Sequence, residues 1–362
     1  MSTGNTGLPP RANPGGQRKK TPVKKKKSPM ALFFKWLLIL VILAILGAAV
    51  YVGTLYLKAE DTVLNTGVDK AVPPEQSAEV KPLTMLILGT DYRPQHQTHL
   101  TDVVMVVSMN PETNTATLVS LPRDSSLQLQ GYRNDRKLNS FYPTFKNLEK
   151  KGGSSAEEEM KTMLSKYLDV PIDYVTVLNF QGFRDVVDAL GGVDVNVKYN
   201  MCHRDSQDGT DINLTAGPQE LDGSKALDYV RYRKSMNCEP KTQESNDFDR
   251  NARQSEVLHS LIDRMKSFGG AVKSYKVLEA VSDNMKTDLE NDQMKNMIKA
   301  YYDVNKENVN FVPITGEWRS PFVYINESEL QQAKQALKDE LEGRHTVEPQ
   351  AAAENADSVS QP

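Results

Sequence analysis

The chain has 362 residues, a quarter of them charged, and a formal net charge of −3. Residues 1–57 carry nine basic and no acidic residues, whereas residues 58–362 have a net charge of −12. An acidic main part argues against general nucleic-acid binding, which needs a surplus of Lys and Arg. Residues 58–362 are long enough to form one large hydrophobic core or two modest ones.

The N-terminal region predicts a membrane anchor. Residues 1–35 are basic and rich in Pro and Gly, which favours a disordered cytoplasmic head. Residues 36–57 contain no charge in 22 positions, and a helix of that length spans about 33 Å, enough to cross the hydrocarbon core. The basic flank places the N-terminus in the cytoplasm and residues 58–362 outside, so we expect a single-pass cell-membrane protein.

Two other interpretations of this region are a cleaved signal peptide and a nucleic-acid-binding head. A cleaved signal peptide would have a shorter apolar core and a small-residue site after it, but Gly47-Ala48-Ala49 lies inside the run. The basic head could instead bind nucleic acid, although orientation in the membrane is the simpler role for it. We therefore expect membrane contact and no nucleic-acid partner.

The remaining chain divides into three parts. Residues 58–81 contain Pro73-Pro74 and little apolar periodicity, which is typical of a stalk. Residues 342–362 are rich in Ala, Glu and Ser and predict a disordered tail. Residues 82–341 lie between them and predict one compact domain.

Apolar patterns give the expected elements of that domain. Strands are predicted, in chain order, at residues 85–88, 103–107, 115–121, 174–178, 193–197, 309–314 and 322–325. Helices are predicted at residues 156–168, 181–190, 247–268 and 327–341. Pro313 cannot donate to a strand ladder, so its strand should lie at a sheet edge. Because strands and helices alternate, the fold class is α/β, with one sheet covered on both faces.

Two carboxylates follow or begin predicted strands. Asp91 comes directly after the first strand, and Asp102 precedes the second. If these strands are neighbours, the two side chains converge at one edge, where a hard cation such as Mg²⁺ could bind them together with water and phosphate oxygens. The alternative is that each aspartate caps a turn or a helix, and spacing alone favours it.

Several arginines stand at element ends. Arg123 leaves the third strand, and Arg231 and Arg233 are two apart, so in an extended chain they face the same side. Arg250 and Gln254 are four apart and share one face of the predicted helix at 247–268. These residues could bind an anionic phosphate or pyrophosphate, or they could form internal salt bridges. The residues by themselves leave both possibilities open.

Cys202 and Cys238 are the two cysteines of the chain. Both belong to the part expected outside the membrane, where a disulfide can persist. A bridge would close the intervening segment into a loop; two separate thiols are the alternative.

Together the motifs resemble the LytR–CpsA–Psr family of bacterial envelope proteins, from about residue 84 to about residue 265. Each piece is common, but their joint order is specific. The pieces are Leu86-Ile87-Leu88-Gly89-Thr90-Asp91-Tyr92-Arg93, Thr101-Asp102, Ser120-Leu121-Pro122-Arg123-Asp124, Lys137-Leu138-Asn139, Val187-Asp188-Ala189-Leu190-Gly191-Gly192-Val193-Asp194-Val195, Leu221-Asp222-Gly223, Ala226-Leu227-Asp228-Tyr229-Val230-Arg231-Tyr232-Arg233, Asp247-Phe248-Asp249-Arg250 and Arg253-Gln254.

The resemblance implies a three-layer domain with a central mixed sheet and an apolar lipid tunnel. It also implies an Mg²⁺-dependent phosphotransferase that moves a glycopolymer, such as teichoic acid or capsule, from undecaprenyl pyrophosphate to peptidoglycan in cell-wall biogenesis. On this view Asp91 and Asp102 serve Mg²⁺ and the reacting phosphate. The residues implied to hold the pyrophosphate are Arg93, Arg123, Arg231, Arg233, Arg250 and Gln254.

One position departs from the family pattern. The family usually has an arginine two positions before the aspartate at 102, where this chain has Leu100. The loss of this contact supports a second hypothesis, a non-catalytic envelope protein that binds polyprenyl-pyrophosphate lipids. A membrane-bound transcription regulator is a third, but residues 1–35 are too short and too rich in Pro and Gly to fold as a DNA-binding domain.

Overall fold

The computed structural model describes residues 66–93, 98–128, 135–206, 209–245, 247–266, 270–302 and 304–344. These ranges belong to one compact unit, Leu55–Pro362. The predicted cytoplasmic head, the predicted span at 36–57 and most of the predicted tail lie outside them. Within the described ranges, no helix has both the length and the apolar character needed to cross a membrane.

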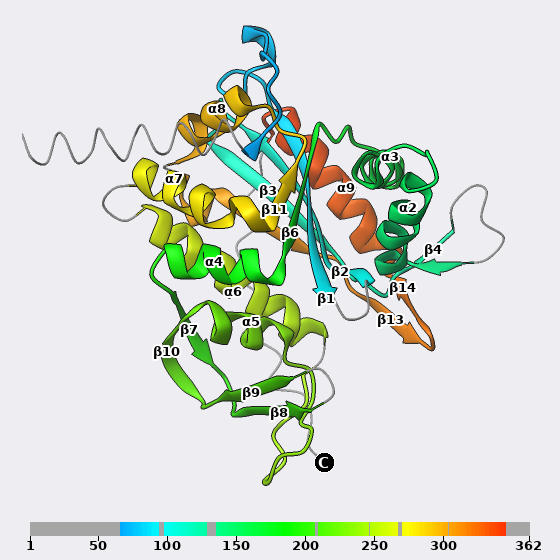
Figure 1. Cartoon of the computed structure of the whole chain (residues 1–362), viewed down its shortest axis with the longest axis vertical. Coiled ribbons are helices and arrows are strands. Elements are labelled where there is room, and N and C mark those ends of the chain that lie inside the picture. Colours follow the sequence, from blue (N-terminus) through cyan, green and yellow to red (C-terminus); the bar gives the residue numbers. More distant parts are fainter. Residues whose placement is uncertain are drawn as a thin grey trace, which may run out of the picture. The chain divides into compact units, whose positions relative to one another are not determined.

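A six-stranded mixed sheet forms the centre of this unit (Figure 1). Its strands, in spatial order, are β11 (Met285–Thr287), β6 (Tyr174–Asn179), β1 (Leu83–Arg93), β2 (Thr98–Asn110), β3 (Thr115–Leu121) and β12 (Val309–Pro313). β1 pairs parallel with β6 and β3 pairs parallel with β12, whereas the other three pairings are antiparallel. The α/β class and the mixed central sheet are therefore confirmed, and β12, which ends at Pro313, lies at the edge as predicted.

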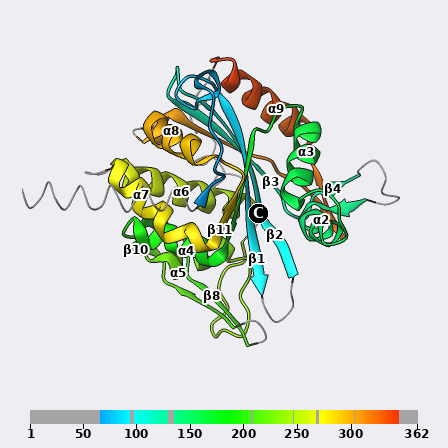
Figure 2. The same ribbon diagram turned by 45° about the horizontal axis from the view of Figure 1, so that its top comes forward.

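Helices cover both faces of the sheet (Figure 2). One face packs against α2 (Phe141–Glu149), α3 (Ala156–Leu168) and α9 (Glu327–Leu341). The helices on the other side are α4 (Phe180–Ala189), α6 (Asp247–Lys266), α7 (Gly270–Val281) and α8 (Asn291–Tyr301). Alternation along β1 explains this division, because Leu86 and Leu88 enter the first core while Met85 and Ile87 face the second.

A smaller group of elements extends the α4 and α6 side. It comprises β7 (Val193–Val197), β8 (Met201–Asp205), β9 (Thr210–Leu214), β10 (Gly217–Leu221) and α5 (Gly223–Arg231). β7 pairs with β10 and β8 pairs with β9, in two separate antiparallel ribbons. Val193, Val195 and Val197 are buried while the residues between them are exposed, so β7 has the predicted alternation, but it is not a strand of the central sheet.

Two further ribbons lie beside the end of β3. They are β4 (Ser126–Leu127) with β5 (Arg136–Lys137), and β13 (Gly316–Arg319) with β14 (Phe322–Ile325). The Val323 N–H donates to the Asp124 carbonyl at 2.9 Å, and Ser125 forms a β-bridge with Val323. The β13–β14 hairpin is thereby fixed to the loop that follows β3.

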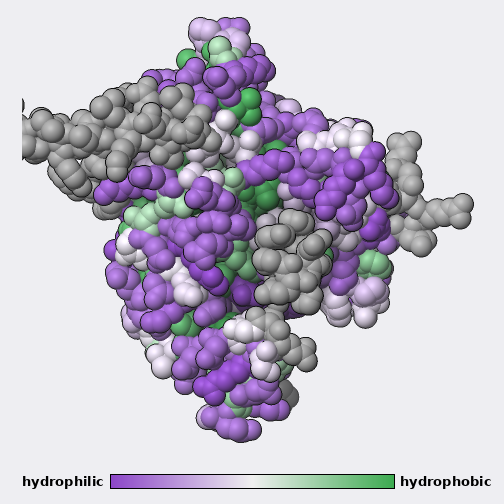
Figure 3. Space-filling view, in the orientation of Figure 1, coloured by the Kyte–Doolittle hydropathy of each residue, from purple (hydrophilic) through white to green (hydrophobic). Residues whose placement is uncertain are grey.

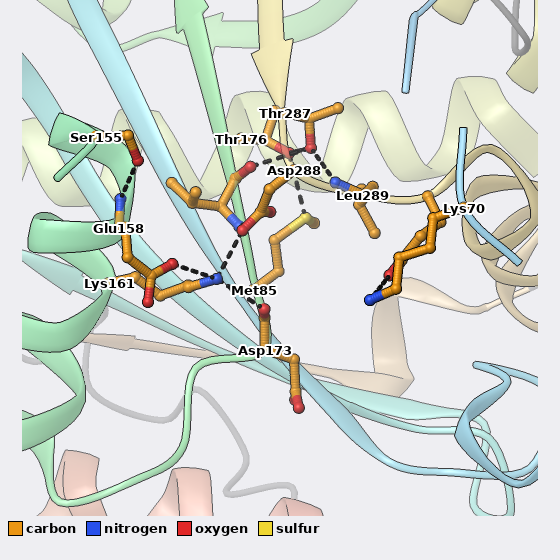
Figure 4. A network of polar contacts seen from close by, with 12 residues as sticks. Lys70, Met85, Ser155, Glu158, Lys161, Asp173, Thr176, Thr287, Asp288 and Leu289 are labelled. Atoms are coloured by element: carbon orange, nitrogen blue, oxygen red, sulfur yellow. Dashed lines mark hydrogen bonds and ion pairs between the residues drawn. The ribbon is translucent and has the colours of Figure 1, made fainter. Parts of the chain in front are cut away.

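The opposite end of the sheet is held by polar contacts around β11 (Figure 4). The Asp288 carboxylate accepts from Lys161 Nζ at 2.7 Å and from the Val175 N–H at 2.6 Å, which joins α3, β6 and the residue after β11. Nearby, the Ala78 N–H donates to Gln293 at 3.0 Å. The end of the predicted stalk therefore packs against α8.

One face of the molecule exposes little apolar area. The face in Figure 3 is mostly hydrophilic where the chain is described, with hydrophobic residues in small separate patches. The exposed large hydrophobic residues include Leu100 on β2 and Trp318 on β13.

Candidate functional site: a cavity with a cationic mouth

A cavity of about 490 Å³ lies between the central sheet and the helices of the α4 and α6 side. Its wall is mainly aliphatic and aromatic. The sheet contributes Ile87, Val103, Met105 and Leu118, and the helices contribute Phe183, Val186, Leu227, Val230, Val257, Leu258 and Leu261. Because these side chains offer no hydrogen-bonding groups, this part of the cavity suits a hydrocarbon chain.

Six of the polar residues predicted from sequence line the same cavity. They are Asp102, Arg123, Arg231, Arg233, Arg250 and Gln254. They come from β2, the loop after β3, α5 with the residues after it, and α6. The structure thus brings four guanidinium groups to one cavity from segments up to 127 residues apart in sequence.

A β-bulge accounts for the position of Asp102. Gly89 pairs with Val103 and Thr90 pairs with Thr101, so Asp102 is the extra residue of β2 at this point. In regular alternation Asp102 and Val103 would face opposite sides of the sheet, but both line the cavity. The strands approach closely here, since a Cβ on Gly89 would stand 2.8 Å from the Val103 Cβ.

Charged side chains contact one another in series from Asp102 to the loop after β3. Arg123 Nη1 donates to Asp102 at 2.5 Å, Arg123 Nε lies 3.6 Å from the Asp124 carboxylate, and Lys137 Nζ donates to Asp124 at 2.9 Å. Arg123 Nε is buried and makes no hydrogen bond within the described chain.

The segment that carries Arg231 differs from its prediction. An extended chain was expected at residues 229–233, but α5 continues to Arg231. The helix begins with the Asp222 carboxylate accepting from the Lys225 N–H at 2.8 Å, and Ala226, Leu227 and Tyr229 are buried at helical spacing. The extended interpretation was therefore wrong, because a capped amphipathic helix precedes the arginine.

Arg231 and Arg233 both line the cavity, but they are not on one extended segment as the sequence spacing had suggested. Arg231 ends α5 and lies over the Phe180 ring at 4.8 Å, while Arg233 follows in the extended residues after the helix. Within the described chain, neither has a carboxylate at ion-pair distance. Burial raises the pKa of Asp228, one turn before Arg231, to about 6, although Arg231 and Arg184 act to lower it.

Two arginines of helix α6, Arg250 and Arg253, have different roles. Arg250 and Gln254, one turn apart, line the cavity as the spacing predicted. Arg253 is buried and donates to the carbonyls of Tyr229 and Tyr232 at 2.8 and 2.6 Å. Arg253 therefore joins α6 to the end of α5 and positions the other arginines.

The segment between α5 and α6 is fastened to β8. The structure links Cys202 and Cys238 by a disulfide with a Cα–Cα distance of 6.1 Å. The Arg204 N–H donates to the Met236 carbonyl at 2.9 Å, so the backbone supports the same attachment. Arg233 lies near the start of this segment, which is thus held against the β8–β9 ribbon.

Asp91 and Arg93, which were also predicted as site residues, are not among the six predicted residues that line the cavity. Asp91 pairs with Leu100 across β1 and β2, which makes it a diagonal neighbour of Asp102, but it is not among the residues that line the cavity. Leu100 is 42% exposed, so the position at which the family usually has arginine is on the surface. The side chain of Arg93 lies outside the described part.

The described ranges contain no cluster of three or more His, Cys, Asp or Glu residues able to hold a metal ion. Asp91 lies within β1 and Asp102 within β2, rather than after and before these strands as predicted, and both are close to the bulge. Mg²⁺ in proteins commonly takes one or two carboxylates and completes its shell with water and phosphate oxygens. Asp91 and Asp102 are the pair that the bulge region offers.

Some lining residues were not predicted. Asn179 ends β6 and caps α4, accepting from the Gly182 N–H at 2.8 Å; an Asn before a helical pattern is a signal that could have identified it. His203 and Lys234 also line the cavity, and His203 Nδ1 lies 2.9 Å from the Lys234 carbonyl. No sequence signal places these two together, because the β8 contact does so.

The class of protein is defined by a mixed sheet with helices on both faces and by an apolar cavity that four arginines also line. The chain matches the model of the LytR_cpsA_psr family over residues 51–344, and it belongs to that family.

Named relatives agree with this assignment. The chain is 30% identical over 318 residues to the polyisoprenyl-teichoic acid–peptidoglycan teichoic acid transferase TagU of Bacillus cereus, covering 85% of this chain and 97% of the relative. It is 31% identical over 240 residues to the Bacillus subtilis transferase TagV, covering 65% of this chain and 57% of TagV.

Solved structures are similar as well. The crystal structure of B. subtilis TagV has a TM-score of 0.57 and 28% identity, covering 74% of this chain and 98% of TagV. A structure of TagT bound to LI-WTA has a TM-score of 0.52 and 26% identity, covering 75% of this chain and 94% of TagT.

Proposed function

We propose that this protein is a membrane-anchored phosphotransferase that moves an anionic glycopolymer of the teichoic acid or capsule type from polyprenyl pyrophosphate to peptidoglycan. The observation that carries the proposal is a cavity whose wall is mainly apolar and whose lining also includes four arginines. The names of TagU and TagV support the same reaction.

The two parts of the cavity match the two parts of such a donor. A polyprenyl chain is hydrocarbon and gains from contact with the aliphatic wall. A pyrophosphate is a compact polyanion, and arginines can donate two hydrogen bonds each to its oxygens. A free nucleotide would make no use of the apolar wall, and a neutral lipid would make no use of the arginines.

The protein's contribution to the reaction is position and charge. Phosphoryl transfer requires little covalent help, so the arginines hold the pyrophosphate and stabilise the charge that develops on its oxygens. An acceptor hydroxyl oxygen forms a new bond to the phosphorus that carries the glycopolymer, and the bridging P–O bond breaks. Polyprenyl phosphate leaves, and the hydroxyl proton passes to Asp102 or to water.

Mg²⁺ is part of this proposal. Asp91 and Asp102 would hold it, and the ion would neutralise charge on the phosphate oxygens. Asp102 is half-buried and bonded to Arg123, so the carboxylate and the guanidinium are already ordered next to each other. The pyrophosphate itself is the activated group, so the reaction needs no ATP outside the cell.

The anchor is proposed from residues 36–57, with the N-terminus in the cytoplasm and the catalytic domain on the outer face. A charge-free segment of 22 residues behind nine basic residues supports it. Tethering would keep the cavity beside the bilayer that carries the lipid donor.

The test is transfer of labelled glycopolymer from its polyprenyl-pyrophosphate carrier to purified peptidoglycan by the full chain in detergent. Arg231→Ala should lower turnover about 100-fold, because one charged donor to the reacting phosphate is lost. The matched control is Arg264→Ala on α6, since Arg264 pairs with Asp194 at 2.9 Å outside the cavity and its loss should change turnover less than twofold. Chelation with EDTA should stop transfer, and added Mg²⁺ should restore it.

Equal turnover of the two arginine variants would contradict the assigned phosphate contact, and full activity in EDTA would contradict the metal. The alternative function is a non-catalytic protein that binds polyprenyl-pyrophosphate lipids. Leu100 supports it, because the usual family arginine is absent at that position. Tight binding of the lipid donor by the wild-type chain without any transfer would establish a non-catalytic lipid-binding protein instead.

A further inference from the structure

A second cavity of about 300 Å³ adjoins the first. The two share Pro122, Arg123, Arg233 and Arg250. The second cavity adds Asp124, Ser245, Trp318 and Val323, and it lacks the aliphatic wall of the first. Three of the arginines assigned to pyrophosphate therefore stand at the boundary between an apolar cavity and a polar one.

Trp318 is the distinctive residue of this second cavity. It lies on β13, and 54% of its surface is exposed although the chain buries most large apolar side chains. The Lys137 ammonium lies 5.4 Å from the centre of its ring. An indole left half in solvent adds little to the core, so the ring face opposite Lys137 is available to a ligand.

The position of Trp318 is set by the loop that carries Arg123. The Val323 N–H donates to the Asp124 carbonyl at 2.9 Å, and Val323 is the direct partner of Trp318 in the β13–β14 hairpin. The Ile314 N–H donates to the Ser120 carbonyl at 3.0 Å at the start of the same segment. Backbone hydrogen bonds thus hold the aromatic ring at a constant place relative to Arg123.

The polar groups around the ring suit a carbohydrate. The C–H bonds on one face of a pyranose are electropositive and pack on the negative face of an aromatic ring. The Asp124 carboxylate, held by Lys137 at 2.9 Å, and the Ser245 hydroxyl could bond to sugar hydroxyls at the ring's edge. An aromatic platform with a few polar groups is what a sugar subsite needs.

We propose that the second cavity binds a sugar of the acceptor glycan, with Trp318 as its stacking platform. This inference rests on the proposed transferase function and adds the place of the acceptor to it. In phosphoryl transfer the attacking and leaving oxygens are roughly in line across the phosphorus. If the leaving polyprenyl phosphate occupies the first cavity, the attacking hydroxyl must come from the other side of the shared arginines.

The kinetic test uses the full chain and varies each substrate while the other is saturating. Trp318→Ala should raise the KM for peptidoglycan glycan strands about 3- to 10-fold, the value of a lost aromatic contact. The KM for the lipid donor and kcat should change less than twofold, and Trp318→Phe should recover most of the acceptor KM. The control is Tyr324→Ala, an exposed aromatic on the same hairpin that does not line the cavity.

Two kinetic outcomes would overturn the inference. An acceptor KM unchanged in Trp318→Ala would mean that the ring does not contact the acceptor. A raised KM for the lipid donor alone would assign the subsite to the donor's own sugar.

A binding measurement separates this inference from the proposed function, because it needs no turnover. The chain has two tryptophans, Trp36 and Trp318, so Trp36→Phe leaves Trp318 as the only indole emitter. Soluble glycan strands from digested peptidoglycan should shift or quench its emission, and teichoic acid polymer without peptidoglycan should not. An emission change with the glycan but no measurable transfer would support the sugar subsite and contradict the transferase function. Transfer without an emission change would support the transferase function and contradict the subsite.

Discussion

Asp228 gives the site a titratable neighbour for Arg231. Burial raises the pKa of its carboxyl from 3.8 to about 6, and the nearby Asp211 and Asp222 act in the same direction. Arg231 and Arg184 oppose the shift. The carboxyl is therefore largely neutral below pH 6 and negative above it, which changes the charge felt by an anion at Arg231.

Asp228→Asn should alter the pH dependence of donor binding. In the wild-type chain, affinity for the polyprenyl-pyrophosphate lipid should fall as pH rises through about 6, because the ionised Asp228 offsets part of the charge of Arg231. The variant should lack this component and bind about threefold or more tightly at pH 7 but equally at pH 5. Titration of the lipid's own phosphates affects both proteins alike, so the ratio of their dissociation constants at the two pH values is the measurement. A constant ratio would show that Asp228 does not act on the ligand.

At the scale of elements, the contact of α5 with α4 decides where Arg231 lies. The Gly223 N–H donates to Asp188 at 2.7 Å, and the helix starts almost in contact with the α4 backbone. A Cβ on Gly223 would lie 2.4 Å from the Arg184 carbonyl oxygen, which is backbone and cannot turn aside. Only glycine allows this approach.

Gly223→Ala should therefore destabilise the chain by about 1–3 kcal/mol and displace the end of α5. Chemical unfolding followed by circular dichroism measures the loss, and lipid binding should weaken with it because Arg231 moves. Ser224→Ala is the control, since Ser224 is the exposed next residue of the same helix and should change stability by less than about 0.5 kcal/mol. Equal stability of Gly223→Ala and Ser224→Ala would mean that α4 and α5 can move apart without a loss of folding free energy.

At the scale of the whole molecule, Glu157 joins three elements that surround the first core. Its carboxylate accepts from Tyr142 at 2.7 Å and pairs with Lys146 at 2.9 Å and Lys286 at 3.0 Å. Burial acts to raise the pKa of Glu157, but the bonds from Tyr142 and the two lysines outweigh it and bring the pKa to about 2. The contribution to stability is thus complete above about pH 4.5 and is lost as pH falls toward 2.

Glu157→Gln should lower the free energy of unfolding at pH 7 by roughly 1–3 kcal/mol, because the buried Tyr142 hydroxyl and the partly buried Lys146 ammonium lose a charged acceptor. The difference from the wild-type chain should shrink steadily below pH 4.5. Glu158→Gln is the matched control, as Glu158 is 57% exposed and its ion pair with Lys161 should add little. A difference that persists undiminished at pH 3 would contradict the lowered pKa.

Local patterns were sufficient for much of the fold. The residues of α3, α9, β3, β7 and β14 agree with the predicted ranges, because each depends on spacing or alternation within a few residues. α5 was missed because its arginine motif was interpreted without the cap at Asp222 and the apolar spacing before it. β7 and β14 were recognised as strands, but their assignment to small separate ribbons depends on pairing partners that no local pattern specifies.

The candidate site divides in the same way. Arg250 and Gln254 were placed correctly because one helical turn relates them. The contact between Arg123 and Asp102 required two strands and a bulge, and a bulge changes the face of a residue without any clear local signal. The meeting of Trp318 with Arg123, nearly 200 residues away in the chain, required the hairpin to dock on the loop after β3.

The amino-acid sequence by itself determined the class of fold, the family resemblance and which arginines to examine, because helix spacing, strand alternation and short motifs are properties of neighbouring residues. Only the tertiary structure decided that six of the predicted side chains share one cavity, that Arg253 is structural and that a second cavity borders the first. The physical reason is that contacts between distant segments depend on strand register and helix approach, which are set by packing across the whole unit.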